Sequence, residues 1–133
     1  MQPPTPLAPD NRVYEATYPG TPRQVRHARA ALAKLLDGCP LAQESVLVAS
    51  ELCANAAVHS ASGAGGEFTV RAELHGNYVR IEVEDGGGPW ARRQYDDRPH
   101  GLDVVQAIAG TGNWGVKGDD AGRVVWARLA WAP

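Results

Sequence analysis

Several features that mark large classes of protein are missing from this sequence. Its 133 residues contain two cysteines, Cys39 and Cys53, which are too few for a disulfide framework and lack the paired spacing of a zinc site. No apolar run approaches the length that crosses a membrane, and the proline-rich start MQPPTPLAPDN differs from a secretory signal peptide. We therefore expect a cytoplasmic protein whose thiols are reduced and buried.

An excess of positive charge is missing as well. Thirteen Lys and Arg against 15 Asp and Glu give a formal net charge of -2 and a pI of about 6.0. This balance disfavours direct binding to nucleic acid or to a membrane surface. The length and the 44% hydrophobic content suit one globular domain. We expect a flexible tail over residues 1–11 and a single domain over 12–133.

The common nucleotide and hydrolase motifs are also absent. The chain has no Gly-x4-Gly-Lys-[Ser/Thr] loop, no His-Glu-x-x-His helix and no Gly-x-Ser-x-Gly elbow. The stretch DGGGPW is not followed directly by a helix, as a dinucleotide-binding fingerprint would require. Any nucleotide site must be built from other residues.

Periodicity and turn residues predict an α+β protein. The expected order is a strand over 12–18, a helix that starts at Thr21-Pro22 and stops at Gly38, a second helix from Pro40 to about Ser60, a hairpin over 67–84 that turns at Gly76-Asn77, a short helix from Gly101, and a strand over 123–131. The segment GVKGDDAG before the last strand is expected to be a loop. This order predicts a two-layer α/β sandwich, in which a mixed, mostly antiparallel sheet carries helices on one face.

A polar stripe crosses the second predicted helix in the stretch SELCANAAVHS. Glu51, Asn55 and His59 recur every four residues, beside an apolar arc that should face the sheet. Leu47 and Val58 flank the stripe on its other side, so we expect Glu51 to be partly buried. A partly desolvated carboxylate needs a partner or a chemical role. The alternative is a structural polar stripe, with Asn55 bonded to nearby backbone.

An inward carboxylate is predicted at the end of the hairpin. Along its second strand Val79, Ile81 and Val83 share one face, and Asp85 is the next residue on that face. The following glycines and Pro89 should leave an open cleft, where Asp85 could accept a hydrogen bond from a ligand amino group. The alternative is an Asp-Gly turn in which the carboxylate caps loop amides.

Gly101 opens the helix GLDVVQAIA, whose first amides are expected to attract phosphate. With this third motif, the chain resembles the ATPase domain shared by DNA gyrase and histidine kinases, and within it the small bacterial anti-sigma-factor serine/threonine kinases. ELCANAAVH resembles the N box of that superfamily, DGGGP its G1 box and HGL the end of its G2 box. The resemblance covers nearly all of residues 12 to 131 and implies the Bergerat ATP-binding fold.

The resemblance also implies a role for each matched residue. Glu51 would be the general base and Asn55 a ligand of Mg²⁺, which prefers oxygen atoms. Asp85 would accept the adenine amino group and Gly87 would admit the base. Gly101 and Leu102 would belong to the phosphate-binding turn, and ATP with Mg²⁺ would be the cofactors.

Two departures from the family pattern bear on these roles. Pro99 stands where relatives have a flexible glycine and removes one amide donor, and Val124 stands where many relatives have a threonine beside the adenine site. The segment WARRQYDDRP is too short for a long ATP lid. Its arginines, Arg92, Arg93 and Arg98, are either phosphate-facing charges or solvated surface.

Two functions follow from the resemblance. The first is an Mg-ATP-dependent kinase that phosphorylates a Ser or Thr of an anti-anti-sigma (antagonist) protein and so controls a sigma factor. The second is a non-catalytic, even nucleotide-free, module that sequesters its partner. Glu51 and Asn55 favour the first, whereas Pro99 and Val124 favour the second. Homodimer formation is compatible with both. An unrelated use of the same scaffold is the third alternative.

Overall fold

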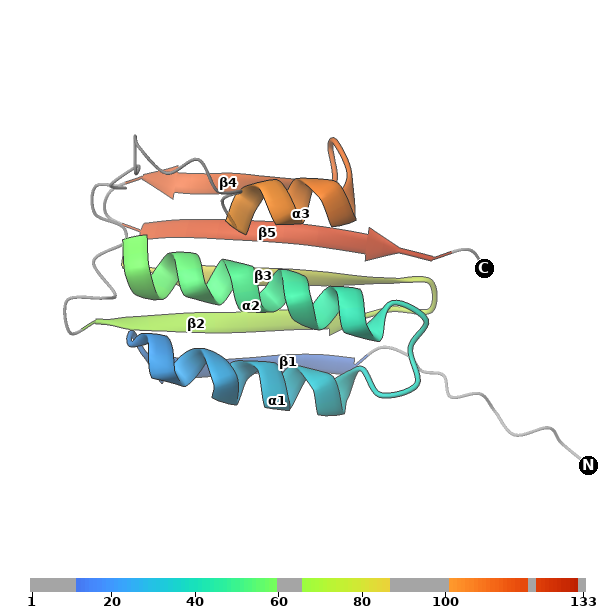
Figure 1. The fold of residues 1–133 in the computed structure, drawn as a ribbon, viewed down its shortest axis with the longest axis horizontal. Coiled ribbons are helices and arrows are strands. Elements are labelled where there is room, and N and C mark those ends of the chain that lie inside the picture. Colours follow the sequence, from blue (N-terminus) through green and yellow to red (C-terminus); the bar gives the residue numbers. More distant parts are fainter. Residues whose placement is uncertain (1–11, 60–65, 87–100, 120–121, 132–133) are drawn as a thin grey trace, which may run out of the picture.

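The structure is a five-stranded antiparallel sheet with three α-helices on one face (Figure 1). This computed structural model describes residues 12–59, 66–86, 101–119 and 122–131. Its elements are β1 (Arg12–Pro19), the 3₁₀ turn η1 (Pro22–Gln24), α1 (Val25–Leu35), α2 (Ala42–His59), β2 (Glu67–Leu74), β3 (Tyr78–Asp85), α3 (Gly101–Ala109), β4 (Trp114–Asp119) and β5 (Gly122–Ala130). The predicted two-layer sandwich is confirmed.

The strands lie in the order β1-β2-β3-β5-β4, and each pairing between them is antiparallel. β1 forms one edge, as predicted for residues 12–18. The predicted hairpin is β2 and β3, closed where the backbone N–H of His75 donates to the carbonyl of Tyr78 at 2.8 Å. Sequence-adjacent strands pair here because a short turn connects antiparallel neighbours at little entropic cost.

The first helix begins differently from the prediction. Thr21 is extended, as an N-cap should be, but its hydroxyl makes no capping hydrogen bond. Instead Pro22 opens a 3₁₀ turn, in which the N–H of Gln24 donates to the carbonyl of Thr21 at 3.0 Å. The α-helix therefore starts only at Val25 and ends before Gly38, the predicted stop. A tighter first turn uses amides that an α-helix would leave unpaired.

The strand β4 corrects the prediction of a loop over GVKGDDAG. Its two glycines obscured the strand pattern, because glycine is depleted in strands. At Gly115 a side chain would meet the Trp126 indole, since a Cβ would lie 2.9 Å from its Nε1 atom. Gly118 has φ +96°, and a Cβ there would lie 2.1 Å from the carbonyl oxygen of Gly122. Both glycines let the β4–β5 pair close tightly.

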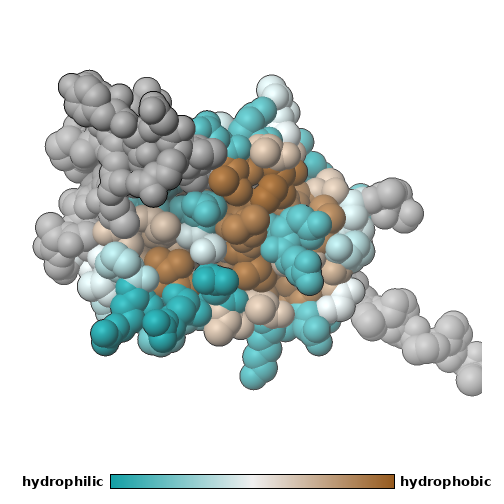
Figure 2. Space-filling model, in the orientation of Figure 1, coloured by the Kyte–Doolittle hydropathy of each residue, from teal (hydrophilic) through white to brown (hydrophobic). Residues whose placement is uncertain are grey.

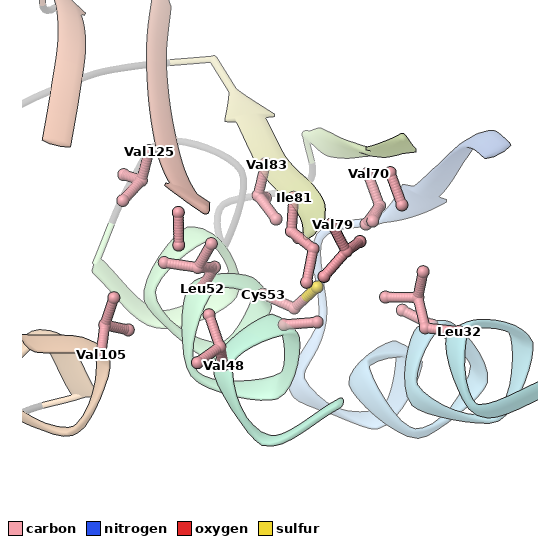
Figure 3. Packing of buried hydrophobic residues seen from close by; sticks show 14 of the residues in the cluster. Leu32, Val48, Leu52, Cys53, Val70, Val79, Ile81, Val83, Val105 and Val125 are labelled. Carbon is pink, nitrogen blue, oxygen red and sulfur yellow. The ribbon is translucent and has the colours of Figure 1, made fainter. Parts of the chain in front are cut away.

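The core lies between the sheet and the helices (Figure 3). α2 contributes Val48, Leu52 and Cys53, which are at most 1% exposed and pack against the inner face of the sheet. From α3, Val105 joins the same cluster. The predicted apolar arc of α2 is thus confirmed at Val48 and Leu52.

The helix side of the molecule has apolar surface in its middle, over α2 and α3 (Figure 2). On α2, Leu47 is 45% exposed, so the flank of the polar stripe at this residue faces solvent. Within the described residues, none of the helices has the length and hydropathy of a membrane span.

Candidate functional site

Three chain segments lie at one end of the sandwich, and a fourth begins on the side that faces this end (Figure 1). They are the last turns of α2, the end of β3 at Asp85, the start of β5 at Gly122 and the start of α3 at Gly101. α2 packs on β3 and on α3, so it connects the sheet with the third helix. The described parts of motifs that are separated in the sequence therefore lie toward the same end of the fold.

Asp85 lies on the inner face of the sheet, as its parity predicted. It continues the buried series Val79, Ile81 and Val83, and it is only 6% exposed. Its Cα partners are Phe68 on β2 and Arg123 on β5. A carboxylate in such a place must be compensated by hydrogen bonds or by a positive charge.

The polar stripe of α2 is half-buried at both of its described members. Glu51 and Asn55 are partly exposed, and their neighbours Leu52 and Ala56 lie in the core. The Nδ2 atom of Asn55 is buried and has no hydrogen-bond partner among the described residues. Buried polar atoms are rarely left unpaired, so this amide points to a ligand or an ordered water. The side chain of His59 lies outside the described part of the chain.

Arg123 is a residue that the sequence prediction missed. It opens the buried series of β5, which continues through Val125, Ala127 and Leu129, and it is 7% exposed. The parity rule that located Asp85 would have found it. Val124 instead lies on the outer face, opposite Glu84 and Lys117. The expectation that Val124 alters the adenine site is therefore wrong, because this residue faces away from the helices.

Comparison with known families agrees with this arrangement. The family model of the histidine kinase-like ATPase domain matches residues 18–126, which include α2, β3, α3 and the start of β5. The chain belongs to this family. Among curated proteins no sequence matches it. Family membership implies that the ATPase domain binds ATP.

The polar groups at this end of the ATPase domain fit such a ligand. Asp85 offers a buried acceptor for an amino group, and α3 begins at Gly101, where a helix has unpaired amides. Leu102 packs against the core and fixes the start of α3. Gly87, Pro99, Arg92, Arg93 and Arg98 lie outside the described residues.

A divalent cation at this site would need phosphate oxygens of the nucleotide among its ligands. Among the described residues no three His, Cys, Asp or Glu side chains come together as a metal site. Mg²⁺ is commonly held by one or two protein oxygens together with phosphate oxygens and water. Rotation of the Asn55 amide exchanges Oδ1 with Nδ2, so this side chain can present an oxygen from its present position.

Proposed function

We propose that this ATPase domain is an Mg-ATP-dependent serine/threonine kinase that acts on an antagonist protein and thereby controls a sigma factor. The observation that carries the proposal is the buried Asp85 at the same end of the fold as Asn55, whose Nδ2 atom is buried and lacks a hydrogen-bond partner among the described residues. Nucleotide binding requires a hydrogen-bond acceptor that recognises the base. It also requires a polar group that holds the metal-bound phosphate.

Each residue has one task in this proposal. Asp85 accepts a hydrogen bond from the adenine amino group, and the family resemblance assigns to Gly87 the task of admitting the base. Gly101 and Leu102 form the turn whose amides bind phosphate, and Asn55 supplies an oxygen to Mg²⁺. When ATP is bound it supplies the γ-phosphoryl group.

Glu51 receives the proton of the attacking Ser or Thr hydroxyl. As the new oxygen–phosphorus bond forms, the bond to the β,γ-bridging oxygen breaks and ADP leaves. Phosphoryl transfer depends mostly on positioning and electrostatics, so a partly exposed carboxylate one turn before Asn55 is suited to this task. Its exposure also leaves it accessible to a hydroxyl from another protein.

A protein partner is supported by the surface of the helix side. Apolar surface lies over α2 and α3 (Figure 2), and exposed apolar patches commonly bind proteins. The net charge of -2 disfavours nucleic acid as the partner. The second candidate function, a non-catalytic module, is favoured by Pro99, because a proline has no backbone N–H to donate to a phosphate.

The test is transfer of label from γ-labelled ATP to a Ser- or Thr-bearing antagonist, recovered from a bacterial lysate with the protein as bait. Glu51→Gln should reduce transfer by about 10²-fold or more while ATP affinity changes by less than about threefold. Asn55→Ala should weaken Mg-dependent ATP binding together with transfer. Glu44→Gln is the matched control, because Glu44 is exposed near the start of the same helix.

Melting curves establish that each variant is folded. If the wild-type protein binds ATP but labels none of the captured proteins, the kinase proposal is wrong and the non-catalytic module replaces it. Capture of nucleic acid alone, persisting at moderate salt, would contradict the proposed protein partner.

A further inference from the structure

Arg123 occupies a position in the sheet that ordinarily belongs to an apolar residue. Its side chain is on the inner face of β5, in line with Val125 and Ala127, and is 7% exposed. Arginine is rarely buried to this extent without a carboxylate or a ligand. Its presence at the end of β5 therefore needs an explanation beyond core packing.

The sheet register supplies a neighbour of opposite charge. Asp85 on β3 and Arg123 on β5 are Cα partners, and both belong to the inner face. Directly opposed residues in antiparallel strands have Cβ atoms about 4.5–5.5 Å apart. The two charges thus lie side by side at the site edge, and each lowers the cost of burying the other.

This pair can present an acceptor and a donor to the same ligand. A guanidinium has five N–H donors, and a bidentate contact to a carboxylate uses two of them. Arg123 makes other contacts, but its buried Nη1 atom has no hydrogen-bond partner among the described residues and can donate to a ligand beside the Asp85 carboxylate. Adenine has the complementary order on its Watson–Crick edge, where the amino donor is next to the acceptor N1.

We propose that Arg123 is a specificity-determining residue, which donates a hydrogen bond to adenine N1 while Asp85 accepts one from the adjacent amino group. This inference rests on the proposed ATP-binding site. Guanine and hypoxanthine have a carbonyl in place of the amino group and an N–H in place of N1. The same pair would then oppose acceptor to acceptor and donor to donor, and a site built for hydrogen bonds rejects such analogues strongly.

The decisive probe is 1-deaza-ATP, in which N1 is replaced by C–H. Titration of the full-length wild-type protein should show about tenfold weaker binding of 1-deaza-ATP than of ATP, as for one lost hydrogen bond to a charged group. Arg123→Met should bind ATP about tenfold more weakly and should bind the two nucleotides within about twofold of each other. Arg123→Lys keeps a donor and should retain part of the preference for ATP.

Arg128→Met is the matched control. It removes the same charge from the same strand, but Arg128 lies on the outer face, with its guanidinium carbon 4.3 Å from the centroid of the Tyr78 ring. The preference of Arg128→Met for ATP over 1-deaza-ATP should equal that of the wild type. A purely structural role of Arg123 predicts a lower melting temperature for Arg123→Met with an unchanged preference, which would overturn the inference.

The outcomes separate this inference from the proposed function. If the wild-type protein binds ATP and 1-deaza-ATP equally, the role of Arg123 is wrong and the ATP site stands. If it binds neither, the proposed ATP site fails and the role of Arg123 fails with it. The wild-type comparison requires no variant, so it decides the question even if Arg123→Met does not fold.

Discussion

The two faces of the sheet hold their charges in different ways. On the outer face, Arg71 forms ion pairs of 2.6 Å with Glu15 and 2.8 Å with Glu84, and all three side chains are at least a third exposed. On the inner face, Asp85 and Arg123 are 6% and 7% exposed. Exposed ion pairs contribute little to stability because water competes for both partners, whereas buried charges require compensation. The inner pair is therefore the one that calls for a functional explanation.

The outer face carries many charged and aromatic side chains, with a few apolar ones such as Val124 among them. The Nη1 atom of Arg80 lies 2.8 Å from Oε2 of Glu82, and its guanidinium carbon lies 5.1 Å from the centroid of the Trp126 ring. Hydrogen bonds to Glu84 and then to Glu15 raise the pKa of Arg71 above its usual value. This array keeps the uncovered face hydrophilic.

The largest expected effect is the difference in reactivity between the two thiols. Cys53 is buried between α2 and the sheet (Figure 3), and this burial raises its pKa from 9.0 to about 12. Cys39 is partly exposed. At pH 8 a thiol reagent such as dithionitrobenzoate should therefore modify Cys39 at least about 10²-fold faster than Cys53 in the native protein. Equal rates, measured on single Cys→Ser variants, would show that the inner layer admits solvent.

The same shift predicts how stability depends on pH. The unfolded thiol ionises at a lower pH than the native thiol, so ionisation favours the unfolded state. The contribution of Cys53 to the free energy of unfolding should be fully present below pH 9 and should be lost as the pH rises towards about 12. Urea unfolding of the wild type and of Cys53→Ala over this pH range measures this contribution. Parallel profiles of stability against pH for the two proteins would contradict the assignment of the effect to Cys53.

Adjacent residues of β3 allow the two faces to be compared directly. Ile81→Ala removes a fully buried side chain and should lower the free energy of unfolding by about 2–5 kcal/mol. Glu82→Ala, on the outer face, should lower the free energy of unfolding by less than about 1 kcal/mol. Urea unfolding at neutral pH provides both values, and similar losses for the two variants would refute the division into faces.

The smallest expected effect is the loss of the outer ion pairs. Arg71→Met should lower the free energy of unfolding by about 1 kcal/mol or less, and the loss should shrink as salt screens the wild-type pairs. Urea unfolding at low and high ionic strength measures the effect. A loss of several kcal/mol that does not depend on salt would place Arg71 among the essential contacts of the sheet.

The sequence predicted the site wherever side-chain alternation was unambiguous. The series from Val79 to Val83 correctly placed Asp85 inside, because a strand alternates strictly between faces. The same alternation in β5 places Arg123 inside and Val124 outside, whereas the family pattern had pointed to Val124 as the residue beside the adenine site. Register between strands, which brings Arg123 opposite Asp85, depends on pairing that a single strand does not encode.

Other parts of the fold were hidden by local composition. β4 contains Gly115 and Gly118, whose roles are set by Trp126 and by the turn to β5, so they resemble loop glycines until the partner strand is known. Helical spacing placed Glu51 and Asn55 on one line, but it could not assign them to a base and a metal ligand. Those roles came from the family resemblance and stay predictions.

The most direct test of the central claim, that the buried carboxylate of Asp85 recognises adenine, is a calorimetric titration with ATP and with GTP, with and without Mg²⁺. The wild-type protein should bind ATP and should bind GTP poorly, and Asp85→Asn should weaken ATP binding by about 1–3 kcal/mol. Asp37→Asn, at an exposed aspartate after α1, should bind ATP like the wild type. Equal affinity of the wild type for ATP and GTP, or unchanged ATP affinity in folded Asp85→Asn, would contradict the claim.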